Sequence, residues 1–236
     1  MRDLFGEIMK DAVSGFPAEY LTERDDGNIK ESLGSQYVAE FDDWLEPEKL
    51  AMDYVRGRVL DIGCGAGRVA LYLQQQGLDV VGIDLSPGAI QVAKSRGIEN
   101  AHLMDAESLE FSEDVFDTVI LFGNNFGILG EEPKIVEMFR TLSTVTTKDA
   151  VILAASVDPL FTDNPKHLAY HEKNRKEGKP PGLLKLRLNY KEEVGDWWNL
   201  LLAEQTRMAD IADQAGWRAD EFIGTPRYYV GVLRKR

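Results

Sequence analysis

The sequence predicts an α/β fold in which a parallel sheet is covered by helices on both faces. Apolar runs at 58–62, 79–83 and 116–123 alternate with amphipathic segments of helical periodicity. Strands that are buried on both faces read as nearly continuous apolar runs, and their alternation with helices is typical of parallel sheets. The length of 236 residues and the hydrophobic content of 44% fit one large domain or one domain with an appended cap.

A glycine-rich turn follows the first strand, and the chain is organised around it. Gly63, Gly65 and Gly67 stand at alternate positions between the strand 58–62 and a helix predicted at about 67–76. Glycines at these positions let the backbone approach a ligand, and the following helix directs its free N–H groups toward it. Asp84 ends the second strand 21 residues after Gly63, close to the ~20 expected between such a turn and a ribose-binding carboxylate. The spacing therefore predicts a nucleotide-binding βαβ unit.

The remaining elements follow in regular order along the chain. Ser86 and Pro87 are typical of a helix start, and Gly77 and Gly97 are typical helix ends. We expect strands at about 99–104, 116–123 and 150–156, a helix at 131–145, half-exposed strands at 183–190 and 197–202, a last helix at 204–215, and closing strands at 217–223 and 228–234.

These elements divide the chain into four predicted parts. Residues 1–56 form an N-terminal helical cap, because Tyr37, Phe41 and Trp44 recur at three- and four-residue spacing. Residues 57–156 form the cofactor-binding core. Residues 157–202 begin with a polar stretch and form an inserted lid or substrate cap, since long loops tend to be functional. Residues 203–236 complete the core with a helix and an antiparallel strand pair.

Composition limits the partners and the compartment. The net charge is −13, which argues against a nucleic-acid partner, since such proteins carry a basic face. No stretch approaches the ~20 apolar residues of a membrane helix, so no membrane partner is expected. Cys64 is the one cysteine, which excludes an internal disulfide and fits a reducing compartment. We therefore expect a soluble, cytoplasmic protein; the sequence does not predict its oligomeric state.

Three carboxylates follow or end predicted strands, where ligands of parallel sheets bind. Asp84 can accept hydrogen bonds from both hydroxyls of a ribose; the alternative is a helix cap for the segment starting at Ser86. Asp105 can accept from an exocyclic purine amine; the alternative is a turn residue at a strand end. Asp61 stands two residues before Gly63, where a carboxylate would repel a pyrophosphate and attract an ammonium group. This favours a zwitterionic amino-acid nucleoside over NAD.

These motifs together resemble those of the class I S-adenosylmethionine-dependent methyltransferases. The resemblance covers about 57–156, through Asp61–Gly67, Val81–Ser86, Asp105-Ala106 and Phe116–Ile120. It implies a Rossmann-like, seven-stranded, mostly parallel sheet whose last strand is antiparallel and inserted between strands five and six. It also implies S-adenosyl-L-methionine as cofactor. The implied cofactor-binding residues are Asp61, Gly63, Cys64, Gly65, Gly67, Asp84, Leu85, Asp105, Ala106 and Phe122.

The segment after the fourth strand bears on the acceptor. Family members that methylate amides or adenine carry Asn/Asp-Pro-Pro-Tyr/Phe there, whereas this chain has Asn124-Asn125-Phe126-Gly127. That segment resembles the one lining the pocket of small-molecule methyltransferases. We therefore predict a substrate pocket of Tyr37, Asn124, Asn125 and Phe126, with Tyr20 and Tyr170 as further candidate aromatics.

No catalytic base and no metal site is predicted. His102 falls within a strand, and His167 and His171 are four residues apart, as a helical base or metal pair would be; solvated loop residues are the simpler interpretation. A sulfonium methyl is already activated, so the enzyme mainly aligns a nucleophile and excludes water.

The predicted function is methyl transfer from S-adenosylmethionine to a small-molecule acceptor by in-line displacement. The alternatives are a protein methyltransferase, a non-catalytic S-adenosylmethionine-binding protein and an NAD-dependent oxidoreductase. The position of Asp61 disfavours the last of these.

Overall fold

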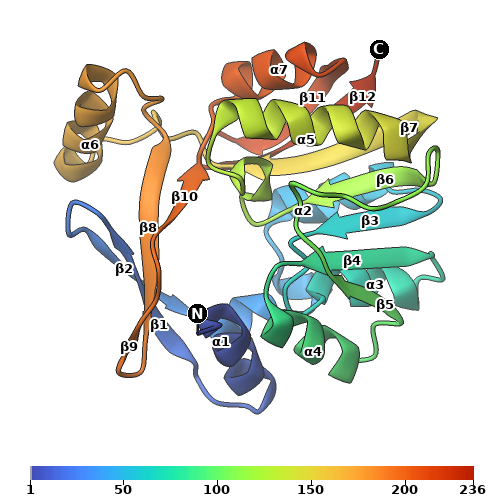
Figure 1. Cartoon of the computed structure of the whole chain (residues 1–236), viewed down its shortest axis with the longest axis horizontal. Helices are drawn as coiled ribbons and strands as arrows, with labels where there is room; N and C mark the ends of the chain where they lie inside the picture. The colour runs from blue at the N-terminus through green and yellow to red at the C-terminus, as the bar shows by residue number, and fades with distance from the viewer. Residues whose placement is uncertain (1) are drawn as a thin grey trace.

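The computed structural model describes residues 2–236 and contains two β-sheets that lie side by side (Figure 1). The larger sheet has seven strands in the order β11-β12-β7-β6-β3-β4-β5. The smaller sheet has the order β10-β8-β1-β2, with β9 paired to β8. In the sequence, β1 and β2 precede the larger sheet, whereas β8, β9 and β10 come between its strands β7 and β11.

The larger sheet has the predicted topology. The strands β3 (Val59–Ile62), β4 (Val80–Asp84), β5 (Asn100–Leu103), β6 (Phe116–Leu121) and β7 (Thr146–Ser156) are parallel to one another. The last strand, β12 (Tyr228–Lys235), runs antiparallel between β7 and β11 (Trp217–Thr225). The prediction of a seven-stranded, mostly parallel sheet with an inserted antiparallel strand is confirmed.

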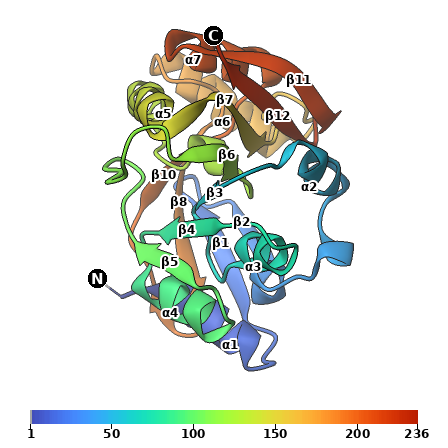
Figure 2. The same cartoon turned by 90° about the vertical axis from the view of Figure 1, so that its right-hand side faces the viewer.

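Helices cover both faces of this sheet, as Figure 2 shows from the side. Leu60 of β3 packs in one apolar cluster with α5 (Glu132–Val145) and α7 (Gln205–Gln214). Its neighbour Val59 packs in the other cluster with α3 (Arg68–Gln75) and α4 (Pro87–Ser95). Successive side chains of a strand point to opposite faces, so a strand that is apolar throughout requires both layers.

The smaller sheet corrects the prediction that residues 1–56 form a helical cap. Only α1 (Leu4–Val13) and the short α2 (Glu46–Ala51) are α-helical there, and β1 (Glu19–Arg24) and β2 (Ile29–Leu33) form a hairpin. The turn of this hairpin is the Asp25–Asn28 cluster. The hairpin joins β8 (Leu183–Tyr190), β9 (Glu193–Val194) and β10 (Trp198–Leu201), with β1 antiparallel to β8.

The aromatic stripe after Ser35 is not one helix. It lies in the 3-10 turns η1 (Gly34–Tyr37) and η2 (Phe41–Asp43), followed by α2 and the 3-10 turn η3 (Met52–Tyr54). Phe41 stacks on Tyr72 with ring centroids 4.3 Å apart, and Trp44 meets the same ring edge-on at 5.3 Å. Pro47 lies in the first turn of α2, where its missing N–H is tolerated.

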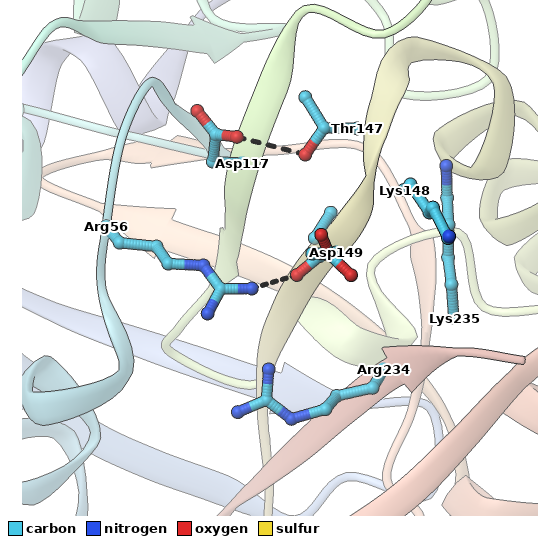
Figure 3. Close-up of a pocket in the computed structure, with 8 residues that line it drawn as sticks. Arg56, Asp117, Thr147, Lys148, Asp149, Arg234 and Lys235 are labelled. Carbon is cyan, nitrogen blue, oxygen red and sulfur yellow. Dashed lines mark hydrogen bonds between the residues drawn. The ribbon is translucent and has the colours of Figure 1, made fainter.

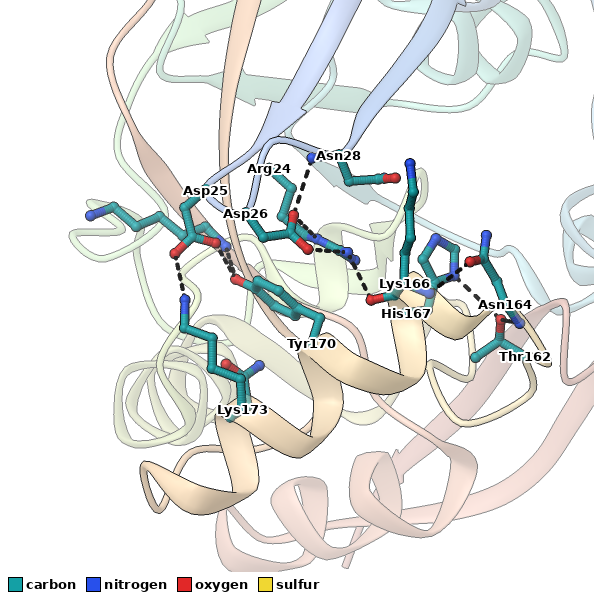
Figure 4. A network of polar contacts seen from close by, with 12 residues as sticks. Arg24, Asp25, Asp26, Asn28, Thr162, Asn164, Lys166, His167, Tyr170 and Lys173 are labelled. Atoms are coloured by element: carbon teal, nitrogen blue, oxygen red, sulfur yellow. Dashed lines mark hydrogen bonds and ion pairs between the residues drawn. The ribbon is translucent and has the colours of Figure 1, made fainter.

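The polar stretch 157–182 contains a helix, α6 (Pro165–Lys176), which the sequence analysis placed in a loop. Figure 4 shows how α6 is fixed to the β1–β2 turn. The Tyr170 hydroxyl donates to Asp25 at 2.7 Å, and the Arg24 guanidinium lies 4.1 Å from the Tyr170 ring centroid. Arg24 also pairs with Asp26. The cation–π contact and the Tyr170–Asp25 hydrogen bond thus hold α6 against a hairpin that is distant in sequence.

Helix α1 lies between the two sheets. It packs on the smaller sheet and on α4, a helix that covers the larger sheet. Leu4 and Ile8 pack with Tyr20 and Leu188 of the smaller sheet. Met9 packs with Ala89 and other apolar residues of α4. Among residues 2–236 no helix combines the length and the apolar character needed to cross a lipid bilayer.

Candidate cofactor and acceptor site

The glycine turn lies at the carboxyl ends of β3 and β4. Gly63, Gly65 and Gly67 all have positive φ, at 71°, 55° and 78°, a region that side chains with a Cβ rarely occupy. The amide N–H groups of Gly63 and Cys64 donate to the Ile83 carbonyl at 2.8 and 3.0 Å. The turn is therefore bonded to the end of β4, which brings it beside Asp84.

Asp84 is bonded to the turn. Its Oδ2 accepts from the Gly65 N–H and its Oδ1 from the Ser86 N–H, both at 2.9 Å. Burial raises the pKa of this carboxyl, and the two N–H donors oppose the shift. The side-chain cap of α4 is Ser86, whose Oγ accepts from the Ala89 N–H at 2.9 Å. Asp84 is therefore not the helix cap that the sequence left as the alternative.

Asp61 is buried with an unused acceptor. Its side chain is 3% exposed, and Oδ2 has no hydrogen-bond partner within residues 2–236. Burial raises its pKa to about 7, against the opposing charge of Arg68. An orphaned buried carboxylate oxygen is unfavourable by itself, so this position suits a ligand that brings a cation or a donor.

The glycine turn is covered by the N-terminal segment. A Cβ built on Gly65 would lie 3.1 Å from Met9 Cε and 3.9 Å from Tyr37 Cδ1. The Tyr37 hydroxyl is 3.0 Å from that of Tyr20, which also accepts a hydrogen bond from Gln36. Tyr37 thus connects the turn to the aromatic residues of the smaller sheet.

The segment after β6 has three different environments. Asn125 donates its amide to the carbonyls of Ile62 and Gly63 at 2.9 and 3.1 Å, so it braces the glycine turn. Asn124 has φ +71°, and its buried Oδ1 has no partner within residues 2–236. The structure corrects the interpretation of Phe126, which is fully buried and packs on Phe139 in the core. Phe126 faces the core because β6 leads into the 3-10 turn η4 (Asn125–Gly127) beneath α5.

The other predicted cofactor residues differ in exposure. Leu85 is 68% exposed just beyond β4. Asp105 is exposed and uses Oδ1 to accept from the Glu107 N–H at 2.9 Å, and Ala106 beside it is half-buried. Cys64 and Phe122 are buried. The exposed residues leave polar and apolar surface open beside the ends of β4 and β5.

A buried polar cluster beneath the turns was missed by the sequence analysis. Glu48 of α2 is 2% exposed and pairs with Arg68 through both carboxylate oxygens, at 2.8 and 2.9 Å. Tyr228 donates to Glu48 at 2.5 Å and accepts from the Gly123 N–H at 3.2 Å. Arg68 directly follows the last glycine of the turn, and this was the available signal; nothing in the sequence marked its two partners.

Two of the three histidines lie away from this site, whereas His102 of β5 is opposite Ile83 of β4, one residue before Asp84. His102 is exposed on β5, and His167 and His171 lie on α6, at the other end of the smaller sheet from α1 (Figure 1). His171 is 3% exposed, with Nδ1 unpartnered within the described residues, so it is not the solvated loop residue that the sequence suggested. No group of three or more His, Cys, Asp or Glu side chains in residues 2–236 is placed to hold a metal ion.

A surface cavity of about 650 Å³ lies at the opposite edge of the sheet, around the amino ends of β6 and β7 (Figure 3). Its polar side chains are mostly bonded to one another or to nearby backbone. Arg56 donates to the Asp149 carbonyl, and Thr147 donates to Asp117 at 2.9 Å. Arg234 pairs with Asp220, which does not line the cavity. This cavity shares no residue with the predicted site.

Comparison with known proteins gives a consistent result over the core. A family model described as a methyltransferase domain matches residues 59–149. The structure of an S-adenosylmethionine-dependent methyltransferase from Bacteroides fragilis, in complex with S-adenosyl-L-homocysteine, is similar with a TM-score of 0.82. That likeness covers 99% of this chain and 94% of the other, at 26% identity.

Two curated relatives match shorter stretches. The putative methyltransferase YqeM of Bacillus subtilis is 24% identical over 119 residues, which is 49% of this chain and 48% of the relative. The 2-heptyl-1-hydroxyquinolin-4(1H)-one methyltransferase of Mycobacteroides abscessus is 42% identical over 72 residues, 28% of this chain and 32% of the relative. The chain therefore spans about half the length, or less, of the curated relatives it matches.

Proposed function

We infer that this chain, whose residues 59–149 form a methyltransferase domain of the class I S-adenosylmethionine-dependent kind, transfers the sulfonium methyl of S-adenosyl-L-methionine to a small-molecule acceptor. The single observation that carries this proposal is that two carboxylates, Asp61 and Asp84, lie next to the same glycine turn. Asp84 is bonded to the Gly65 N–H, and Asp61 is buried with an unpartnered oxygen.

The residues present fit this cofactor. Asp61 would accept from the ammonium group of the methionine part, because its orphaned oxygen lacks a donor. Asp84 would accept from the ribose hydroxyls with its remaining lone pairs. Leu85, Asp105 and Ala106 would border the adenine, and the three glycines would lie under the methionine part. The cofactor supplies an already activated methyl group; this chain's residues bind it, orient the acceptor and exclude water.

The acceptor that we propose is an uncharged, flat, largely apolar small molecule. Support comes from the aromatic side chains that connect the glycine turn to the smaller sheet. Phe5 meets Tyr37 edge-on at 6.4 Å and Trp198 at 5.5 Å between ring centroids. Aromatic side chains favour such partners, and Asn124 adds a polar atom without a partner. The quinolone methyltransferase among the relatives is consistent with this class of acceptor.

We propose that residues 1–56 and 157–202 act together as one cap over the core. The support is the antiparallel pairing of β1 with β8 and the packing of α1 against Leu188 and Tyr190. The core would then comprise 57–156 and 203–236. A cytoplasmic location and the absence of a nucleic-acid partner stay predictions from composition.

The test is calorimetric titration of the purified protein with S-adenosylhomocysteine, with NAD as the parallel control. We expect micromolar binding of the first and no binding of the second. A panel of uncharged aromatic acceptors with methyl-labelled S-adenosylmethionine then tests turnover. Binding of NAD alone would overturn the proposal. Tight cofactor binding without turnover on any small-molecule or protein acceptor would indicate a non-catalytic binding protein.

A further inference from the structure

The buried cluster of Glu48, Arg68 and Tyr228 connects the two turns that surround the proposed site. Arg68 begins α3 directly after the glycine turn. Gly123 lies in the turn after β6, and its N–H donates to Tyr228 at 3.2 Å. Tyr228 in turn donates to the carboxylate that pairs with Arg68. One carboxylate therefore holds groups that come from both sides of the site.

We propose that Glu48 and Tyr228 are positioning residues of the cofactor and acceptor site. Glu48 fixes the position of the charged Arg68 side chain next to the glycine turn, and Tyr228 fixes the turn that contains Gly123. This inference rests on the proposed function for the identity of the ligand. Neither residue contacts the reacting atoms in it, and both act through the turns that they hold.

The geometry of the ion pair explains why Glu48 holds the Arg68 guanidinium in place. The ion pair is bidentate, and Glu48 is almost fully buried, so the attraction is little screened by water. The guanidinium also lies 4.9 Å from the centroid of the Trp44 ring, which restricts its movement. Pro47 packs against Gly224, so that α2 is fixed to the β11–β12 hairpin. The carboxylate is thus delivered by a rigid part of the fold.

The charges around Asp61 connect this pair to ligand binding. Arg68, Asp84 and Glu48 are the charged groups that act on the Asp61 carboxyl. Arg68 lowers its pKa, whereas Asp84 and Glu48 raise it. Loss of the Glu48 charge would leave the Arg68 cation uncompensated and favour the ionised form of Asp61.

The Gly123 turn depends on Tyr228 for a different reason. Gly123 and Asn124 both have positive φ, at 69° and 71°, and a non-glycine residue in that region is unfavourable unless its surroundings hold it. The Tyr228 hydroxyl supplies the hydrogen bond that anchors the first of the two. Phe122 and Asn124, predicted for cofactor and acceptor, flank this bond.

The experiment compares three single variants of the full chain with the unmodified protein. Glu48→Gln removes the charge and keeps the shape. Tyr228→Phe removes the hydroxyl and keeps the ring. Tyr54→Phe is the matched control for Tyr228→Phe. Tyr54 also donates its hydroxyl to a carboxylate, Glu221, at 2.5 Å, but this bond lies on an exposed surface. S-adenosylhomocysteine affinity is measured by calorimetry between pH 5.5 and 8, and amide hydrogen exchange of Gly123 by NMR.

For Glu48→Gln we expect the pH midpoint of the affinity to fall by at least about half a unit, because a nearby cation stabilises the carboxylate. For Tyr228→Phe we expect faster exchange at Gly123 and an affinity about three- to tenfold weaker, with an unchanged midpoint. Tyr54→Phe changes neither readout. A folded Glu48→Gln protein with the unmodified midpoint, or a Tyr228→Phe protein with unchanged Gly123 exchange, overturns the inference.

Failure of the proposed function gives a different result. If the unmodified protein does not bind S-adenosylhomocysteine, that proposal fails, while Gly123 exchange still tests the role of Tyr228 without any ligand. If Glu48→Gln does not fold, Tyr228→Phe, which leaves the ion pair intact, carries the test.

Discussion

Asp3 of the N-terminal segment caps α4 through Ser86, although 83 positions separate the two residues. The Asp3 carboxylate accepts from the Ser86 hydroxyl at 2.7 Å and from the Gly88 N–H at 2.7 Å. It also accepts from the Gly6 N–H at 2.9 Å and so caps its own helix, α1. One carboxylate therefore satisfies free N–H groups at the starts of both α1 and α4. Helix α4 begins shortly after Asp84.

This shared cap predicts a stability effect for Asp3→Asn. An amide has one acceptor oxygen, and its NH₂ group would face an N–H donor of one of the two helices. We expect the free energy of unfolding to fall by about 1–2 kcal/mol, measured by urea denaturation. Asp196→Asn, an exposed acid in the β9–β10 turn, is the control for the loss of one charge. Equal stability of the two variants would contradict the shared cap.

The close approach of α1 and α4 predicts an unusual sign for Gly88→Ala. Alanine favours a helix over glycine by up to about 1 kcal/mol. Here, however, the added Cβ would lie 2.7 Å from the Gly6 Cα, so α1 must move away. We expect net destabilisation by about 1–3 kcal/mol, measured by thermal unfolding. Gln91→Ala on the exposed side of α4 is the control, and a stabilised Gly88→Ala protein would refute the contact.

Loss of the Asp84 carboxylate should weaken cofactor binding. Asp84→Ala removes the acceptor proposed for the ribose and the bond to the Gly65 N–H. We expect S-adenosylhomocysteine affinity to fall by about 2 kcal/mol or more, which is roughly thirtyfold. Calorimetry on a variant with an unchanged circular dichroism spectrum measures this. Unchanged affinity would remove Asp84 from the ribose site.

The raised pKa of Asp61 predicts a pH dependence of binding. In the free protein its carboxyl has a pKa of about 7, mainly because of burial. A bound ammonium group favours the carboxylate, so binding lowers this pKa and releases a proton at pH values below about 7. Affinity should therefore be constant above pH 7 and fall by up to about tenfold per pH unit below it. Calorimetry in buffers of different ionisation enthalpy detects the proton; Asp61→Asn should abolish its release.

The core could be predicted from the sequence because its signals are local. Each of the glycines at 63, 65 and 67 is required by positive φ within one turn, and Asp84 follows at the length of one helix and one strand. The alternation of apolar strands and amphipathic helices likewise depends only on near neighbours. Such features do not depend on which distant segments meet.

The smaller sheet and the buried cluster could not be predicted because they depend on distant pairs. Strand β1 pairs with β8, so that Leu21 lies opposite Asn189, and no short-range pattern indicates that pairing. The aromatic spacing at 37–45 is the same for one helix as for two 3-10 turns, of which only the second packs on Tyr72, through Phe41 and the adjacent Trp44. The pairing of Glu48 with Arg68 likewise follows only from the docking of α2 on the β11–β12 hairpin.

Acidification should loosen α6 through His171. The buried ring has a lowered pKa because burial and the cations Arg175 and Arg24 disfavour its charged form, as does His167; only Asp158 opposes them. The folded pKa lies below the unfolded value of 6.5, so the neutral ring contributes stability above pH 6.5 that is lost as the pH falls through the folded pKa.

We expect hydrogen exchange of 165–176, corrected for the intrinsic rate, to increase from pH 7.5 to pH 5. His171→Phe, which cannot be protonated, should remove this increase, while His102→Phe on the exposed strand β5 should retain it. Equal protection of α6 at both pH values in the unmodified protein would show that its hold on the β1–β2 turn rests on the Tyr170 and Arg24 contacts alone.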